Sequence, residues 1–265
     1  MSFDHKLLAS FDVHNGVLYQ KDLARPGDFE KRYVQLREKE NRLYRDEIVK
    51  RLPRIPVDHP TRNEWHLRKI CLDELVSHLE KRGQCKSILE VGCGNGWLSH
   101  ALVTSLGAGV CALDINEIEL NQGARVFKSD DLTFVYADIF TVPFNGYQFD
   151  TIILASATQY FADVPRLLSR LLELLTPTGR IYLVDSPWYS EATVGNARAR
   201  SRAYFDSIGF PEMADNYFHH TWSALVPFNF EIFFNPNSLA SLIERKLLMK
   251  QRPHFPWIVI KPRYR

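Results

Sequence analysis

The residues best suited to bind a ligand form a glycine-rich turn, and an acidic residue comes shortly before this turn. The sequence reads Glu90-Val91-Gly92-Cys93-Gly94-Asn95-Gly96, with an apolar run before it and a helical pattern after it. Glycines at such a junction expose backbone N–H groups and let a ligand approach without any Cβ in the way. The pattern therefore predicts a ligand-binding turn, although glycine-rich turns also serve only to connect a strand to a helix.

The same turn departs from the pattern of dinucleotide-binding proteins. A G-x-G-x-x-G turn would need glycine at position 97, where the sequence has Trp97, and that glycine normally lets the helix pack closely with the pyrophosphate at its N-terminus. Glu90 would repel a pyrophosphate but attract an ammonium or sulfonium group. These two residues argue against NAD or FAD.

Two further acids follow the next two apolar runs. Asp114 follows Val110–Leu113, and Asp138 comes shortly after Leu132–Tyr136. Either acid alone is often only a helix cap. The carboxyl ends of parallel strands meet at one edge of an open α/β sheet, and ligands bind along that edge. The ordered set of turn and acids therefore predicts a cofactor site.

The segment Leu89–Gly96 resembles the first motif of the class I S-adenosylmethionine-dependent methyltransferases, and the layout with an N-terminal helical cap resembles their bacterial small-molecule members. The resemblance covers about residues 87–185. It implies that the turn holds the methionyl part of S-adenosylmethionine, that Asp114 takes the ribose hydroxyls and that Asp138 accepts from the adenine amino group. The cofactor residues that it implies are Glu90, Gly92, Cys93, Gly94, Asn95, Gly96, Asp114, Ile115, Asp138, Ile139 and Ala155.

The acceptor side is less defined. The turn Ala155–Thr158 lacks the Asn/Asp-Pro-Pro-aromatic motif of the family's adenine and glutamine amide methylating members, which disfavours a DNA base or a protein glutamine. His219 is the candidate catalytic base because histidine titrates near neutral pH, or it is a partly exposed residue with ordinary hydrogen bonds. The aromatic residues after the last parallel strand predict either an acceptor pocket or the core of a lid: Tyr189, Tyr204, Phe205, Phe210, Tyr217, Phe218 and Trp222.

Arg68 offers a further contact to the cofactor. It lies one helical turn after Trp65, so it would reach the cofactor's carboxylate with the indole packed beneath it. The alternative, which the sequence favours, is a surface position for Arg68.

These residues must be positioned by alternating short apolar runs and helical stretches, which are typical of a buried parallel sheet. The sequence predicts strands at Ser87–Val91, Gly109–Leu113, Leu132–Tyr136, Phe149–Leu154 and Arg180–Val184. Helices are expected near Gly96–Leu106, Glu117–Phe127 and Val164–Leu175, the last closed by Pro177 and Gly179. The predicted fold class is α/β, a doubly wound and mostly parallel sheet.

The flanking segments predict additions to this sheet. Helical spacing predicts a helix from Phe29 to about Lys50, and Thr61 with Glu64 suits the capping box of a second helix that runs to Gly83. We expect residues 1–83 to form an N-terminal helical cap and residues 84–265 to form the cofactor-binding domain, with an acceptor-site insertion at about 186–228. In the tail we expect helices at Ser190–Phe210 and Ser238–Met249, a strand at Phe230–Phe234 and a final antiparallel strand at Trp257–Ile260.

Composition excludes several other classes of protein. The net charge of +2 gives no sign of a nucleic-acid or membrane partner. Four cysteines without zinc-finger or disulfide spacing predict reduced thiols and no metal. With neither a secretory signal nor an apolar stretch long enough to cross a bilayer, a cytoplasmic location is expected. The oligomeric state stays open.

The sequence therefore predicts a methyltransferase that acts on oxygen, nitrogen or carbon of a small-molecule acceptor, with S-adenosylmethionine as cofactor. Two alternatives belong to other classes of protein. The first is a non-catalytic module that binds S-adenosylmethionine as a sensor or scaffold. The second is a nicotinamide-dependent oxidoreductase, which Trp97 and Glu90 disfavour.

Overall fold

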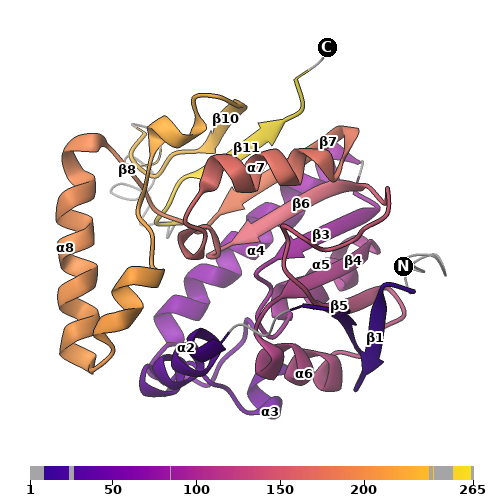
Figure 1. Ribbon diagram of the computed structural model, residues 1–265, viewed down its shortest axis with the longest axis horizontal. Coiled ribbons are helices and arrows are strands. Elements are labelled where there is room, and N and C mark those ends of the chain that lie inside the picture. Colours follow the sequence, from indigo (N-terminus) through magenta and orange to yellow (C-terminus); the bar gives the residue numbers. More distant parts are fainter. Residues whose placement is uncertain (1–8, 24–26, 84, 239–240, 242–252, 264–265) are drawn as a thin grey trace.

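A computed structural model describes residues 9–23, 27–83, 85–238, 241 and 253–263. Within these residues the dominant element is a nine-stranded sheet with the order β1-β2-β5-β4-β3-β6-β7-β11-β10 (Figure 1). Its central strands are β3 (Ser87–Val91), β4 (Gly109–Asp114), β5 (Leu132–Tyr136), β6 (Phe149–Ala155) and β7 (Leu175–Val184). These five strands are parallel to one another, as the sequence predicts.

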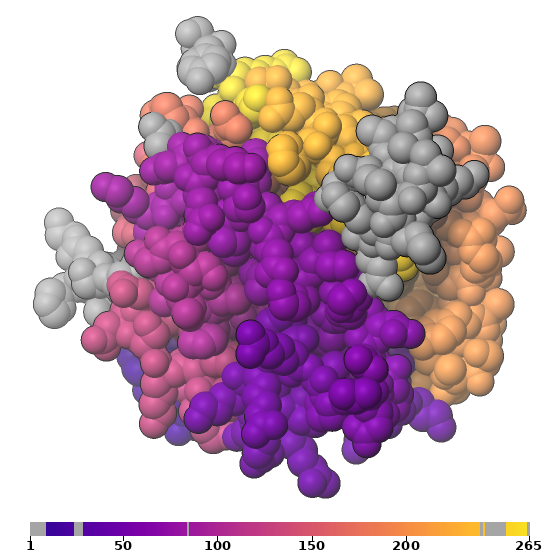
Figure 2. All heavy atoms as spheres, turned by 180° about the vertical axis from the view of Figure 1, so that it is seen from behind, coloured from indigo at the N-terminus to yellow at the C-terminus, as the bar shows by residue number. Residues whose placement is uncertain are grey.

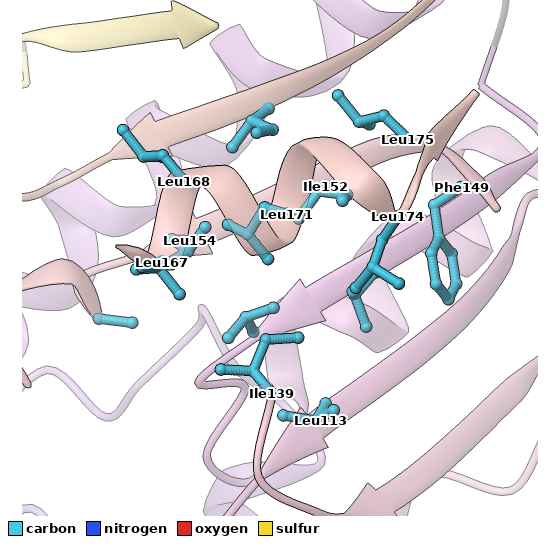
Figure 3. Packing of buried hydrophobic residues seen from close by; sticks show 14 of the residues in the cluster. Leu113, Ile139, Phe149, Ile152, Leu154, Leu167, Leu168, Leu171, Leu174 and Leu175 are labelled. Atoms are coloured by element: carbon cyan, nitrogen blue, oxygen red, sulfur yellow. The ribbon is translucent and has the colours of Figure 1, made fainter. Parts of the chain in front are cut away.

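Alternate residues of each central strand face opposite layers, because side chains on a strand point to the two faces in turn. Along β3, Leu89 and Val91 belong to one buried cluster while Ile88 belongs to the other. Helix α7 (Val164–Glu173) covers the first face, where its leucines meet Ile152 and Leu154 of β6 (Figure 3).

Four helices cover the second face of the sheet: α3 (Asp46–Val49), α4 (Arg62–Arg82), α5 (Trp97–Leu106) and α6 (Glu117–Val126). Seen from behind, the purple residues, which include α3 and α4, spread across this face (Figure 2). With helices on both faces, the sheet is doubly wound. None of the helices within the described residues is both long and apolar enough to cross a bilayer.

The N-terminal segment differs from the predicted helical cap. Residues 11–20 form a hairpin of β1 (Phe11–His14) and β2 (Val17–Gln20), and β2 pairs in parallel with β5. The turn between them contains Asn15 at φ 52° and Gly16 at φ 82°, the positive angles that a tight hairpin turn needs. The Asn-Gly pair is therefore a hairpin signal, and the helical prediction is wrong for this stretch.

The first predicted helix is also interrupted. Helix α2 (Gly27–Lys39) ends before Asn41, whose φ of 57° is incompatible with a continuing α-helix, and α3 begins only at Asp46. The capping box at Thr61 is not formed. The Thr61 hydroxyl bonds to the side chains of Tyr44 and His59 instead.

Strand β7 begins earlier than predicted. Pro177 and Gly179 lie inside it rather than at the end of α7, and the pairing with β6 shifts register between Phe149 and Thr151. A bulge of this kind accommodates a proline that cannot join the regular ladder.

The C-terminal part adds two antiparallel strands and a lateral helix. Its elements are β8 (Trp188–Tyr189), α8 (Glu191–Ile208), η2 (Pro211–Asn216), β9 (His220–Thr221), η3 (Trp222–Leu225), β10 (Asn229–Phe234) and β11 (Trp257–Lys261). The predicted final strand, β11, pairs with β7, but β10 pairs outside it and forms the edge, which corrects the expectation that the sheet ends at Trp257–Ile260. The predicted helix Ser238–Met249 lies almost wholly outside the described residues.

Helix α8 contacts α2 through a small separate hydrophobic core. Leu36 of α2 packs there with Phe205 of α8 and Met213 of η2. Figure 1 shows α8 and α2 on the same side of the sheet, at the ends of the central arrows. This core brings an early and a late segment of the chain together beside the edge where ligands are expected.

Candidate functional site

A cavity of about 470 Å³ lies at the carboxyl ends of β3 to β7, between these strand ends and the helices α2 and α4. It brings together all the predicted cofactor residues except Gly96. Those that line it are Glu90, Gly92, Cys93, Gly94, Asn95, Asp114, Ile115, Asp138, Ile139 and Ala155.

The glycine turn has the backbone conformation that its sequence predicts. Gly92, Gly94 and Gly96 have φ angles of 77°, 55° and 72°, a region that L side chains rarely adopt. Gly96 is buried, and a Cβ there would lie 2.4 Å from Cε1 of Phe134. Gly96 therefore lets the start of α5 approach β5, while Gly92 and Gly94 face the cavity.

Asp114 connects two of the turns at the strand ends. Its Oδ2 accepts from the N–H of Gly94 at 2.7 Å, and its Oδ1 accepts from Ile115 and Asn116 at 2.7 and 2.9 Å. The carboxylate thus has the cap-like role that the sequence left open. A carboxylate offers about four lone-pair positions, so it also retains capacity for a ligand in the cavity.

Glu90 and Glu119 are two further acids of the lining. Burial raises the pKa of Glu90 to about 8, and Ser99 donates a short hydrogen bond to its carboxylate. Burial and the nearby Asp114 raise the pKa of Glu119 to about 7. Glu119 was not among the sequence-predicted site residues. The sequence feature that could have pointed to Glu119 is its position three residues after Asn116, whose side chain accepts from the Glu119 N–H at the start of α6.

Asp138 joins the site to the N-terminal hairpin. Its Oδ1 accepts from the N–H of Phe140 at 2.9 Å, and its own N–H donates to Oε1 of Gln20 at 3.2 Å. The neighbouring Ile139 is buried. The hairpin therefore helps to hold the strand end that carries the predicted adenine contact.

Arg68 lines the cavity, in contrast to the surface position that the sequence favours. Its guanidinium lies 4.9 Å from the ring centroid of Trp65 and pairs with Glu64 at 2.9 Å. Its Nε is buried and has no hydrogen-bond partner among the described residues. A buried donor without a partner is costly, so this N–H indicates a ligand acceptor atom.

The guanidinium of Arg68 ends a chain of alternating charges. Arg37 pairs with Glu40 at 3.1 Å, Arg42 bridges Glu40 and Glu64 at 3.3 and 2.9 Å, and Glu64 pairs with Arg68. The chain links α2 to α4 across the cavity and contains one more arginine than glutamate.

The end of the cavity at η1 (Thr158–Tyr160) carries aromatic residues from α2, from η1 and from the position after it. Tyr33, Tyr160 and Phe161 line it, and Arg37 donates to the Tyr160 hydroxyl at 3.1 Å. The ring centroids of Tyr33 and Tyr160 are 5.6 Å apart in an edge-on arrangement. These residues give this end of the cavity apolar walls with a few polar groups.

His219 lies elsewhere. It is not among the described residues that line the cavity. It is buried, its Nε2 is 2.8 Å from the Ser201 hydroxyl, and its ring packs against Tyr189 and Tyr217. Burial lowers its pKa. The residues predicted for an acceptor pocket or a lid core are likewise absent from the described lining, and Phe205 packs in the small core with α2.

Comparisons with known proteins agree with this geometry. Residues 88–179 match the family model described as "Methyltransferase domain". The chain is 30% identical over 115 residues to malonyl-[acyl-carrier protein] O-methyltransferase of Erwinia billingiae, covering 43% of this chain and 44% of the relative. It is 35% identical over 99 residues to demethylmenaquinone methyltransferase of Clavibacter sepedonicus, covering 37% and 40%. The chain thus spans less than half the length of these relatives.

Among solved structures, magnesium protoporphyrin IX methyltransferase from Synechocystis PCC 6803 with bound SAH aligns with a TM-score of 0.54. The sequence identity is 16%, and the alignment covers 90% of this chain and 97% of the other. Residues 88–179 therefore form a methyltransferase domain, and the chain has the class I methyltransferase fold. The predicted fold class is confirmed.

Proposed function

We propose that this chain is an S-adenosylmethionine-dependent methyltransferase of a small-molecule acceptor and that it acts in the cytoplasm. The observation that carries the proposal is the single cavity that the glycine turn, Glu90, Asp114, Asp138 and Arg68 line together. These groups come from three successive strand ends and from the helix above them. Their chemistry matches the parts of this cofactor one by one.

In the proposal, Arg68 pairs with the cofactor's carboxylate through its unpartnered Nε, and the methionyl chain lies along Gly92 and Gly94, which line the cavity. Asp114 accepts from the ribose hydroxyls. Asp138 accepts from the adenine amino group, with Ile115 and Ile139 beside the ring. Glu90, Cys93 and Asn95 complete the methionyl side, and Ala155 borders the reacting centre.

The charge of the lining supports a cationic cofactor over a dinucleotide. Several carboxylates face a few arginines that are paired with glutamates. A pyrophosphate would meet repulsion here, whereas a sulfonium and an ammonium are attracted. When bound, the cofactor supplies an activated methyl group. The protein's contribution is to align the acceptor and exclude water.

The aromatic residues of the lining favour an enzyme over a sensor, because a sensor needs no binding surface for a second molecule. Tyr33, Tyr160 and Phe161 line the cavity in addition to the proposed cofactor residues. His219 as the base stays a prediction that its place outside the described lining does not favour.

Calorimetric titration with S-adenosylhomocysteine and with NAD tests the proposal. We expect binding of S-adenosylhomocysteine and none of NAD; the reverse result would favour an oxidoreductase. Incubation with labelled cofactor and cell extract, followed by mass spectrometry, then identifies the acceptor. Tight cofactor binding without any labelled product would favour the sensor.

Arg68→Gln tests the proposed carboxylate contact. We expect it to weaken S-adenosylhomocysteine binding by about 1.5–3 kcal/mol, the range for a lost charged hydrogen bond. Binding of 5′-methylthioadenosine, which lacks the amino-acid part, should be unchanged and serves as the matched control. An equal loss for both ligands would mean that Arg68 only maintains the shape of the cavity.

A further inference from the structure

Ser156 and Asp185 lie side by side in the cavity wall, where Ser156 follows Ala155, the residue that the proposed function places beside the reacting centre. They follow β6 and β7, which pair in parallel as far as Ala155 and Val184. Both residues line the cavity, and the Ser156 hydroxyl donates to Oδ2 of Asp185 at 2.6 Å. Neither belongs to the proposed cofactor residues.

Both residues have an unusual backbone conformation. Their φ angles are 54° for Ser156 and 53° for Asp185, in the left-handed region that is costly for residues other than glycine. Such conformations persist where the surroundings hold them, and they cluster at ligand-binding sites. Here two of them are neighbours on one sheet edge and are hydrogen-bonded to each other.

One oxygen of the Asp185 carboxylate is available to accept a hydrogen bond from a ligand. Within the described part of the chain, Oδ2 accepts from Ser156 and no hydrogen bond to Oδ1 is formed. The groups that influence this carboxylate are Arg68, Glu64 and Cys71 on α4 and His254 before β11. Burial raises the pKa of Asp185, which suits a carboxylate that exchanges a proton.

The charges around the cavity restrict what the acceptor can be. Three arginines line it, Arg37, Arg42 and Arg68, and all three pair with Glu40 or Glu64. The acids in the lining are Glu30, Glu64, Glu90, Asp114, Glu119, Asp138 and Asp185. Glu90 and Glu119, with pKa values of about 8 and 7, are wholly or partly protonated near neutral pH, and the other five acids still outnumber the three arginines. This excess of acids disfavours an anionic acceptor and favours one that donates hydrogen bonds.

We propose that Asp185, held in place by Ser156, binds the N–H or O–H group of the acceptor, which is therefore an amine or a hydroxyl compound. This inference rests on the proposed function. In the transfer, the acceptor nitrogen or oxygen forms a bond to the methyl carbon. The carbon–sulfur bond breaks with its electron pair passing to sulfur, and the acceptor's proton passes to the Asp185 carboxylate.

Sinefungin provides a probe that does not need the true acceptor. In this cofactor analogue a carbon that bears an amine replaces the sulfonium and its methyl, so the amine lies where the acceptor group would approach. We compare its affinity with that of S-adenosylhomocysteine by calorimetry at mildly alkaline pH. Asp185→Asn should lower the ratio of the two affinities by about tenfold or more, because a charge-assisted hydrogen bond is lost.

The chain offers suitable companion variants. Asparagine tolerates the left-handed region, so Asp185→Asn removes the charge without adding strain. Ser156→Gly removes the hydroxyl at a φ that glycine adopts freely, and it should lower the ratio by a smaller factor. Asp215→Asn changes an exposed acid outside the described lining, and its ratio should match that of the wild type.

The outcomes separate the two proposals. If the wild type binds both ligands and Asp185→Asn leaves the affinity ratio unchanged, the role of Asp185 is overturned while the proposed function stands. If the wild type binds neither ligand, the proposed function fails and this inference fails with it. Should Asp185→Asn not fold, the ratio measured with Ser156→Gly decides, since an unchanged ratio there also overturns the inference.

Discussion

At the scale of single residues, the acids of the cavity differ in how the protein accommodates them. Asp114 is held by three backbone N–H groups, whereas Glu90 is buried against Ser99 with a pKa of about 8. Hydrogen bonds to a carboxylate favour its charged form, and burial favours the neutral form. Burial raises the pKa of both acids, and at Asp114 the three N–H groups oppose that rise.

Asp114→Ala should weaken binding of S-adenosylhomocysteine by about 1.5–3 kcal/mol, the range for a lost charged hydrogen bond. The variant also leaves three backbone N–H groups without their acceptor, so thermal unfolding must be measured beside calorimetry. Asp114→Asn, which keeps a carbonyl oxygen, should lose less in both measurements. Unchanged affinity in a folded Asp114→Ala protein would mean that the residue is only a cap.

Glu90 should make the stability of the ligand-free protein depend on pH. Its pKa in the folded state, about 8, exceeds the ordinary glutamate value of 4.5, so the folded state retains a proton that the unfolded state releases. The contribution of Glu90 to stability is then present below about pH 4.5 and is lost as pH rises towards 8. Glu90→Gln removes this loss and still accepts from Ser99.

The measurement is urea unfolding of both proteins at several pH values. The stability of Glu90→Gln relative to the wild type should increase by about 1 kcal/mol or more between roughly pH 5 and 8. A difference that stays constant with pH would contradict the buried, protonated state of Glu90.

At the scale of elements, glycine positions decide how closely helix and strand approach. A Cβ at Gly96 would lie 2.4 Å from Phe134 of β5, but a Cβ at Gly107 would meet nothing within 4 Å. Both residues have positive φ, 72° and 61°. Their comparison therefore separates steric overlap from backbone strain.

Gly96→Ala should destabilise the protein by about 1–3 kcal/mol more than Gly107→Ala, the usual cost of overpacking a core. Both variants carry the cost of a positive φ, of about 1–2 kcal/mol. Chemical unfolding of the two variants gives the difference. Equal losses would mean that Phe134 moves aside without cost.

The elements also reveal how far a sequence predicts this fold. The central strands were predictable because buried parallel strands form nearly continuous apolar runs. The hairpin at Phe11–Gln20 was missed because its strands are short and β1 is largely exposed. The break in the first helix depends on one residue, Asn41, whose backbone conformation no periodicity reveals.

The site was predictable only where its residues lie at or just after the carboxyl ends of strands. Glu90, Asp114 and Asp138 belong to that set. Glu119 and Arg37 lie on helices, and whether a helical residue faces the cavity depends on how the helix is docked. Asp185 directly follows a strand, but a lone acid there has too many structural explanations to single it out.

At the scale of the whole molecule, the cavity separates the sheet edge from a layer made of α2 and α4. The two helices are connected by the charge chain from Arg37 to Arg68, and α2 packs on α8 through Leu36. A ligand in the cavity would touch both the sheet edge and this layer.

Binding of S-adenosylhomocysteine should therefore slow amide hydrogen exchange in α2 and α4 more than in α7, which covers the opposite face. The physical reason is that a ligand which binds only the folded arrangement suppresses local opening around itself. Hydrogen-exchange mass spectrometry measures this directly. Equal slowing in all three helices would indicate global stabilisation instead of contact with the layer.

The pairing of β2 with β5 has a consequence for the newly made chain. The partner residues Leu18 and Val135 are far apart in sequence, so the first hairpin leaves the ribosome long before the strand that it joins. Synthesis proceeds at about 5–20 residues per second. The edge of β2 that pairs with β5 therefore remains unpaired for several seconds. Leu36 gains its packing partners later still, when Phe205 and Met213 have been synthesised. The layer that covers the cavity is thus begun first and completed late, because α2 meets its partners in α8 and η2 only after most of the sheet has been synthesised.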